Sequence, residues 1–119
     1  MEIKYPVTEI DKYYILLLFL SPIKPFSELR RRELQVYSQL LRYRDKYKQL
    51  SLKEQNKLIF DYDVRQEIAE IYGMSVDGVY NVVSSLKKRG LVDEDGIVER
   101  YANLISLEKG YLKINFMNK

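Results

Sequence analysis

The sequence contains no cysteine, no histidine and no tryptophan among its 119 residues. Without cysteine and histidine, the chain has no thiol nucleophile, no imidazole for acid–base catalysis and no Cys/His zinc site. It also has no glycine-rich loop of the kind that holds phosphates in enzymes. We therefore expect no enzyme activity, no cofactor and no metal site. The lack of cysteine fits a cytoplasmic protein, because disulfides are typical of exported chains.

A long hydrophobic run is absent as well. The longest apolar stretch, YYILLLFL at residues 13–20, has eight residues, whereas a membrane-spanning helix needs about 20. The acidic residues Glu2, Glu9 and Asp11 precede it, where a secretory signal peptide needs positive charge. The stretch therefore predicts a buried core helix, and we expect no membrane partner.

The composition that remains is typical of a soluble globular domain. Hydrophobic residues make up 46% of the chain and charged residues 31%, a balance that supports a packed core. A chain of this length can bury that core as a single domain, residues 1–119, without disulfides or metal. The chain has 11 tyrosines and many Lys, Ile and Asn residues. A composition of this kind is common in proteins from AT-rich genomes, including those of phages and mobile elements.

Three helices are predicted in the N-terminal helical part, residues 1–60. The expected ranges are 9–20, 28–50 and 52–59. Pro22 ends the first helix because its ring cannot continue it, and Thr8, with an acid three residues later, resembles a capping box for that helix. Ser27 and Ser51 precede the other two helices at the N-cap position. This part of the chain carries twelve basic and seven acidic residues.

The long basic helix 28–50 should have one apolar side. Its apolar residues recur at intervals of three, four and seven, the spacing of a helical face. They are Leu29, Val36, Leu40, Tyr43, Tyr47 and Leu50. We favour packing against the first helix, because a chain of this size needs that core. The alternative is an interface in a homodimer or higher oligomer, since the same spacing suits helix pairing.

Two further helices are predicted on either side of a glycine. The first should cover residues 64–72 with Asp61 or Asp63 as its N-cap, and the second should cover about 76–89 behind a serine N-cap. Gly73 lies between them, where the chain needs a residue that tolerates positive φ. The pattern is that of a helix-turn-helix.

The residues at the helix crossing match the requirements of that motif. The first helix needs a small residue, the turn needs a glycine, and the second helix needs an apolar residue that faces inward. Ala69, Gly73 and Val79 stand at these places. The segment of about residues 64–99 therefore resembles a winged helix-turn-helix, as found in bacterial and phage regulators and replication initiators. The resemblance implies a mainly α fold with a small β-wing, here with an N-terminal helical extension.

A short hairpin is expected after the second of these helices. The β-prone pairs at residues 91–92 and 97–98 flank Asp-Glu-Asp-Gly at residues 93–96, a sequence that favours a turn. This hairpin would complete the winged helix-turn-helix, residues 61–100.

The C-terminal tail, residues 101–119, should contain one strand. Leu112, Ile114 and Phe116 alternate with polar residues, the period of a half-buried strand. A turn at residues 108–110 would precede it, and the residues before that turn carry no clear pattern.

The resemblance implies which residues would meet DNA. In this fold the second helix lies in the major groove, and its N-terminal half reaches base edges. The outward residues are Ser75, Val76, Asp77, Tyr80, Asn81 and Ser84, with Lys87, Lys88 and Arg89 as backbone contacts at the far end. Further backbone contacts are expected from Arg30, Arg31 and Arg32. A solvated helix face would show the same pattern, and cations near a helix C-terminus also favour its dipole.

The charge distribution opposes part of this interpretation. Residues 61–100 hold nine acidic and five basic residues, whereas DNA affinity depends on neutralising phosphates. An acidic tip at residues 93–95 would be repelled from the minor groove, so we expect no wing insertion there. Helix 76–89 would therefore bind DNA with help from the basic helix 28–50.

Two functions remain open. The first is a DNA-binding winged helix protein, a transcription regulator or replication accessory of phage or mobile-element type, in the host cytoplasm, with double-stranded DNA as its partner. The second is a phage assembly, virion or packaging adaptor in which the winged helix binds protein. There the acidic wing would meet the basic helix of a neighbouring subunit. We favour the first because the motif geometry supports it directly.

Overall fold

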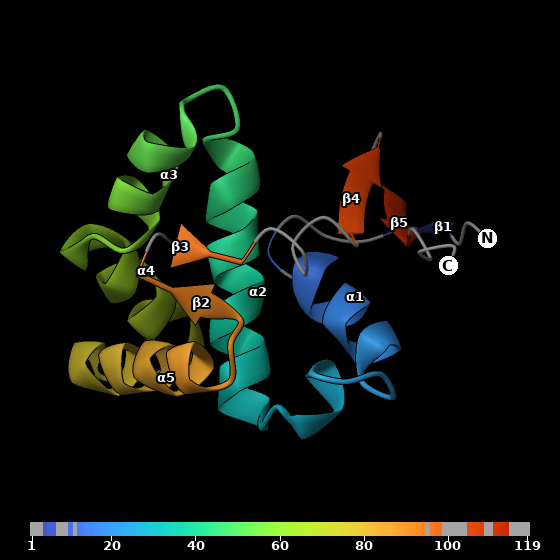
Figure 1. Ribbon diagram of the computed structural model, residues 1–119, viewed down its shortest axis with the longest axis horizontal. Coiled ribbons are helices and arrows are strands. Elements are labelled where there is room, and N and C mark those ends of the chain that lie inside the picture. Colours follow the sequence, from blue (N-terminus) through green and yellow to red (C-terminus); the bar gives the residue numbers. More distant parts are fainter. Residues whose placement is uncertain are drawn as a thin grey trace.

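The computed structural model describes residues 4–6, 10, 12–94, 96–98, 105–108 and 111–114. The helices are α1 (Lys12–Leu20), α2 (Arg31–Lys46), α3 (Leu52–Ile59), α4 (Tyr62–Tyr72) and α5 (Val76–Lys88), with a short 3₁₀ helix η1 (Phe26–Glu28) (Figure 1). The strands are β1 (Lys4–Pro6), β2 (Val92–Asp93), β3 (Gly96–Ile97), β4 (Ile105–Glu108) and β5 (Tyr111–Ile114). The expected mainly helical chain with a small antiparallel hairpin is confirmed.

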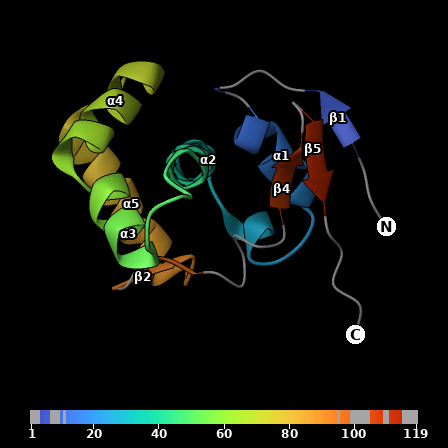
Figure 2. The ribbon, with the colours of Figure 1, turned by 90° about the horizontal axis from the view of Figure 1, so that it is seen from above.

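Helix α2 lies at the centre of the fold. Helix α1 and the sheet of β1, β5 and β4 lie on one side of it, and α3, α4 and α5 lie on the other (Figure 2). Every side chain from residue 33 to residue 41 is buried. Because four of these residues are polar, their hydrogen-bonding groups need partners inside the protein.

The apolar seam of α2 packs inside the subunit. Val36, Leu40 and Tyr43 are buried in one cluster with Leu16 of α1 and Ile68 of α4. The interpretation favoured from the sequence, intramolecular packing, is therefore confirmed for the central part of the seam.

Helix α2 is shorter than predicted at both ends. Ser27 lies in η1 and is not the N-cap. The helix begins later, where the carboxylate of Glu33 accepts the N–H of Arg30 at 3.0 Å. Beyond the other end, the N–H of Leu50 donates to the carbonyl of Tyr47 at 2.9 Å in a tight turn. The range 28–50 was wrong because hydrophobic spacing indicates which side is apolar but does not mark where a helix stops.

Helices α4 and α5 form the expected pair. Asp61 is the N-cap of α4, which begins at Tyr62, two residues earlier than predicted. Gly73 follows in the left-handed conformation, with φ 63° and ψ 38°. Ala69 and Val79 are buried where the two helices cross. The three features that indicated a helix-turn-helix are therefore present. Helix α3, which precedes this pair, spans the predicted range of residues 52–59.

The hairpin of β2 and β3 packs against the body of the protein. Its antiparallel register pairs Val92 with Ile97 and Asp93 with Gly96, one residue away from the predicted strands. Val92 and Ile97 are buried in the core cluster, which holds the hairpin beside α5. Asp95, the third acid of the predicted tip, lies outside the described residues.

A second, three-stranded sheet has the antiparallel order β1-β5-β4. The strand predicted over residues 112–116 corresponds to β5, and β4 occupies part of the segment that carried no clear pattern. No sequence pattern predicted β1, which is only three residues long. The Thr8 capping box, the expected turn residues 109–110 and Phe116 lie outside the described residues.

The apolar run at residues 13–20 belongs to α1. Leu16 and Leu17 are fully buried, whereas Leu18 and Phe19 are each 45% exposed. The prediction of a core helix is confirmed. Across the described ranges, no helix is both long enough and apolar enough to cross a membrane.

Replacing Gly96 with alanine should destabilise the protein. Gly96 has φ +126°, and a Cβ there would overlap the side chain of Asn56 on α3. The strained backbone and the overlap together should lower the free energy of unfolding by about 2 kcal/mol or more. Urea denaturation followed by circular dichroism would measure the loss.

Gly73→Ala is the matched control for backbone strain alone. Gly73 also has positive φ, but a Cβ there meets no atom within 4 Å, so we expect a loss of about 1–2 kcal/mol. Adding Asn56→Ala to Gly96→Ala should recover the part due to overlap. Equal losses for both glycine variants, with no recovery, would contradict the role given to Asn56.

Candidate nucleic-acid interface

The first residues of α5 serve the helix itself. The hydroxyl of Ser75 accepts the N–H of Gly78 at 2.9 Å, which makes Ser75 the N-cap. Val76 is half-buried and packs against the core. Both residues were candidates for DNA contact, and both have a structural role that accounts for them.

The outward side of α5 follows from its burial pattern. Val79 and Leu86 are fully buried, so positions on the opposite side of the helix project outward at 100° per residue. These positions are Asp77, Asn81, Ser84 and Lys88, all exposed or half-buried.

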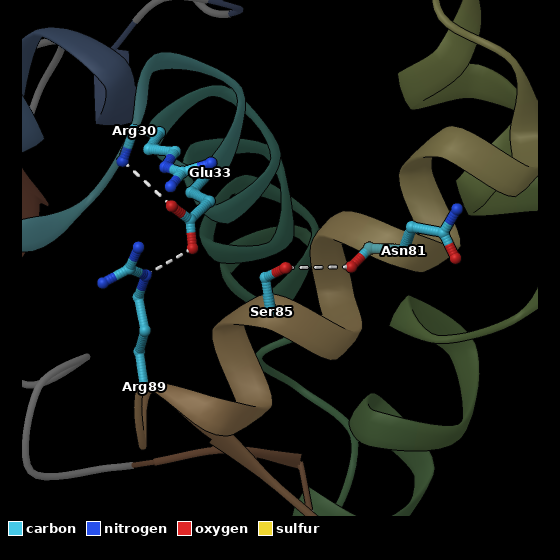
Figure 3. A network of polar contacts seen from close by, with 5 residues as sticks. All are labelled: Arg30, Glu33, Asn81, Ser85 and Arg89. Carbon is cyan, nitrogen blue, oxygen red and sulfur yellow. Dashed lines mark hydrogen bonds and ion pairs between the residues drawn. The ribbon is translucent and has the colours of Figure 1, made fainter.

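Asn81 has the side chain most suited to reading a base. Ser84 donates its hydroxyl to the carbonyl of Tyr80, and Ser85 donates its hydroxyl to the carbonyl of Asn81, both at 3.2 Å. The amide group of Asn81 instead projects away from the body of α2 (Figure 3). An exposed amide of this kind can both donate to and accept from an adenine edge.

One flank of α5 carries Tyr80 and Lys87. Tyr80 is 56% exposed, and the guanidinium of Arg65 on α4 lies 5.5 Å from the centre of its ring, within the range of a cation–π contact. Arg65 was not singled out from the sequence, because it belongs to the preceding helix and no local spacing connects it to Tyr80.

A basic hollow lies along the other flank of α5. It has a volume of about 670 Å³ and is lined by Arg30, Arg31, Arg32, Glu33, Val82, Ser85, Lys88 and Arg89. Five of these residues are basic and one is acidic. The structure therefore brings the predicted backbone contacts at the start of α2 together with two of those at the end of α5.

A buried carboxylate joins the two sides of the basic hollow. Glu33 accepts the backbone N–H of Arg30 with one oxygen and the Nε–H of Arg89, at 2.5 Å, with the other (Figure 3). This hydrogen bond, together with the charge of Glu33, raises the pKa of Arg89 above its ordinary value. Arg89 is therefore held in place at the edge of the hollow, and one of the five positive charges is compensated.

The arginines at the start of α2 differ in how they are held. Arg32 donates through Nη1 to the carbonyl of Tyr72 at 3.0 Å and to Oε1 of Gln35 at 3.2 Å. It thus caps the C-terminal end of α4, where helix carbonyls lack partners. Within the described residues, the side chains of Arg31 and Lys88 form no such hydrogen bond. They are the cations most free to meet a phosphate.

A second concave surface, the α3–α5 groove, lies on the flank of Tyr80. It has a volume of about 980 Å³ between α3, α5 and the hairpin. Lys53 and Lys57 of α3 and Lys87 of α5 line it, as do the acidic Asp93 and Glu94 of the hairpin. The two lysines of α3 were not identified from the sequence, because only the fold brings α3 and α5 to the same groove.

Comparison with known proteins assigns no family. No family model matches the sequence, and no curated protein or solved structure is significantly similar to it. The functional interpretation therefore depends on the outward side of α5 and the two concave surfaces beside it.

Glu33→Gln should lower the thermal stability of the protein. The amide keeps the shape of the side chain and can still accept the N–H of Arg30, but it loses the charge that binds Arg89. Breaking a buried ion pair on one side leaves the hydrogen-bonding groups imperfectly matched. We expect the midpoint of thermal unfolding to fall by several degrees, as followed by circular dichroism.

Glu28→Gln provides the charge-matched control. Glu28 is exposed and forms an ion pair with Lys24, four residues earlier, at 3.8 Å, and its charge has a smaller effect on Arg89 than that of Glu33. An exposed pair of this kind contributes little to stability. The same unfolding midpoint for both variants would show that the contact between Glu33 and Arg89 has no structural role.

Proposed function

We propose that this protein is a sequence-specific, double-stranded DNA-binding protein of the winged helix-turn-helix kind, with α5 as its reading helix. The observation that carries the proposal is the basic hollow, in which five cations from α2 and α5 gather beside the exposed side of α5. A transcription regulator or a replication accessory, of phage or mobile-element type, is the role that such a protein would have.

The dimensions of α5 fit this role. Its 13 residues make a rod about 20 Å long and about 10–12 Å wide with its side chains, and the major groove is about 12 Å wide. Asn81 lies near the middle of the helix and would read a base edge. Arg31 and Lys88, on the flank, would contact the phosphates that set the position of the helix.

The acidic charge of residues 61–100 does not prevent this binding. Four of the nine acids, Asp61, Asp63, Glu67 and Glu70, belong to α4 or its N-cap. Helix α5 itself has one acid, Asp77, and two lysines in its last turn. Asp77 lies in the first turn, where a negative charge favours the helix dipole and where it can accept a hydrogen bond from a cytosine amino group.

One observation favours the alternative function, an assembly adaptor in which the winged helix binds protein. Asp93 and Glu94 are exposed on the hairpin, and the basic hollow lies on the opposite flank of α5. Neighbouring copies could therefore meet head to tail through these surfaces. Light scattering at low salt distinguishes the two functions, since a chain of copies would grow with protein concentration without any DNA.

Arg31→Ala combined with Lys88→Ala should weaken binding to any duplex. Each lost phosphate contact reduces the salt dependence, so the slope of log K against log salt should become smaller by about two. Fluorescence anisotropy with a labelled duplex, across a salt series, measures both the affinity and the slope. Lys24→Ala combined with Lys48→Ala is the control, because it removes two exposed lysines that line neither concave surface. If both double variants weaken binding equally, the hollow is not the contact surface.

Asn81→Ala should reduce sequence preference while leaving stability unchanged. The side chain is exposed, so the free energy of unfolding should stay within about 0.5 kcal/mol of the wild type. Loss of a base contact should narrow the difference between selected and scrambled duplexes by about 1–3 kcal/mol. The measurement needs a duplex selected by the wild-type protein from a random pool. Gln49→Ala, another exposed amide, should keep the full preference. An unchanged preference in the Asn81 variant would exclude this residue as a reader.

A further inference from the structure

The residues that line the α3–α5 groove support an inference that rests on the proposed function and extends it. We infer that α5 lies in the major groove as a ridge between two phosphate backbones, and that α3 contacts the second backbone through Lys53 and Lys57. The basic hollow would contact the first. This inference assigns helix α3 to the DNA-binding surface, together with the basic hollow.

The positions of the lysines support this assignment. Lys53 and Lys57 are both exposed, and at a spacing of four residues they lie on the same side of α3. Lys87 of α5 is exposed on the facing side of the groove. Three cations from two helices thus line one concave surface, on the flank of α5 opposite the basic hollow.

The geometry of duplex DNA makes this two-sided arrangement informative. The major groove is bounded by a sugar–phosphate backbone on each side, and a helix of about 10–12 Å diameter nearly fills its width of about 12 Å. Phosphates therefore run along both flanks of an inserted helix. Cations on one flank would suit any polyanion, whereas cations on both flanks of a ridge suit a duplex.

The acids of the hairpin limit where the second backbone can lie. Asp93 and Glu94 line the same groove from the hairpin side and repel phosphates, while Lys53 and Lys57 attract them from the α3 side. The second backbone is therefore held against α3 and away from the hairpin. The covered DNA should accordingly be short, with the minor groove beside the hairpin left open.

Hydroxyl-radical footprinting tests the inference, because it reports protection on each strand separately. The experiment uses a duplex selected by the full-length wild-type protein and labels each strand in turn. Lys53→Gln combined with Lys57→Gln should remove protection from one strand, while Arg31→Gln combined with Lys88→Gln should remove it from the other. Each double variant should raise the dissociation constant about tenfold at 0.1 M salt. Lys24→Gln combined with Lys48→Gln should change neither strand.

The outcomes separate this inference from the proposed function. If the wild-type protein binds no duplex at low salt, the proposed function fails, and the inference fails with it. If the wild type binds and the α3 variant gives the wild-type footprint on both strands, the inference alone is overturned. Equal loss of protection on both strands in the α3 variant would show a general effect of charge and would also overturn it. Circular dichroism of each variant confirms that the fold is retained, since all of these lysines and Arg31 are exposed.

Discussion

Helix α2 is buried between the other elements of the fold, and this burial determines how they are placed around it. A helix in this position must satisfy each polar group within the protein, because an unpaired buried group is costly. Gln39, which is fully buried, donates through Nε2 to the carbonyl of Ile10 at 3.0 Å and to the hydroxyl of Tyr72 at 2.8 Å. Its Oε1 accepts the Nε–H of Arg42 at 2.6 Å. The polar residues of α2 thus fix the chain before α1 and the end of α4 at defined places around one helix.

This arrangement explains why charge counted along the sequence gives a misleading view of the surface. The acidic segment and the basic segment are separate in the chain, but α2 begins beside the end of α5. Helix α5 therefore lies beside cations that its own segment does not contain. The charge of one segment therefore does not show which cations lie beside α5, and it does not reveal the two lysines of α3 that line the neighbouring groove.

Sequence signals predicted the ends of those helices that are set by interactions within a few residues. Ser51, Gly73 and Ser75 act on backbone groups within a few residues, and the element boundaries that they mark are close to those observed. The start of α2 was missed because its N-cap is an arginine, Arg30, a residue type that does not indicate an N-cap. The contact of Arg65 with Tyr80 and the pairing of β1 with β5 depend on the finished fold. Of the candidate site, the outward side of α5 was predictable, whereas the hollows beside it were not.

One carboxylate, Glu33, serves two partners, and this has a thermodynamic consequence. The same group that begins α2 also restrains Arg89, so an anion that draws Arg89 toward itself competes with Glu33 for that guanidinium. The two hydrogen bonds use different oxygens of Glu33, so the carboxylate can release Arg89 and still accept the backbone N–H that begins α2. Exchange of Arg89 between Glu33 and an anion therefore leaves the first turn of the central helix capped.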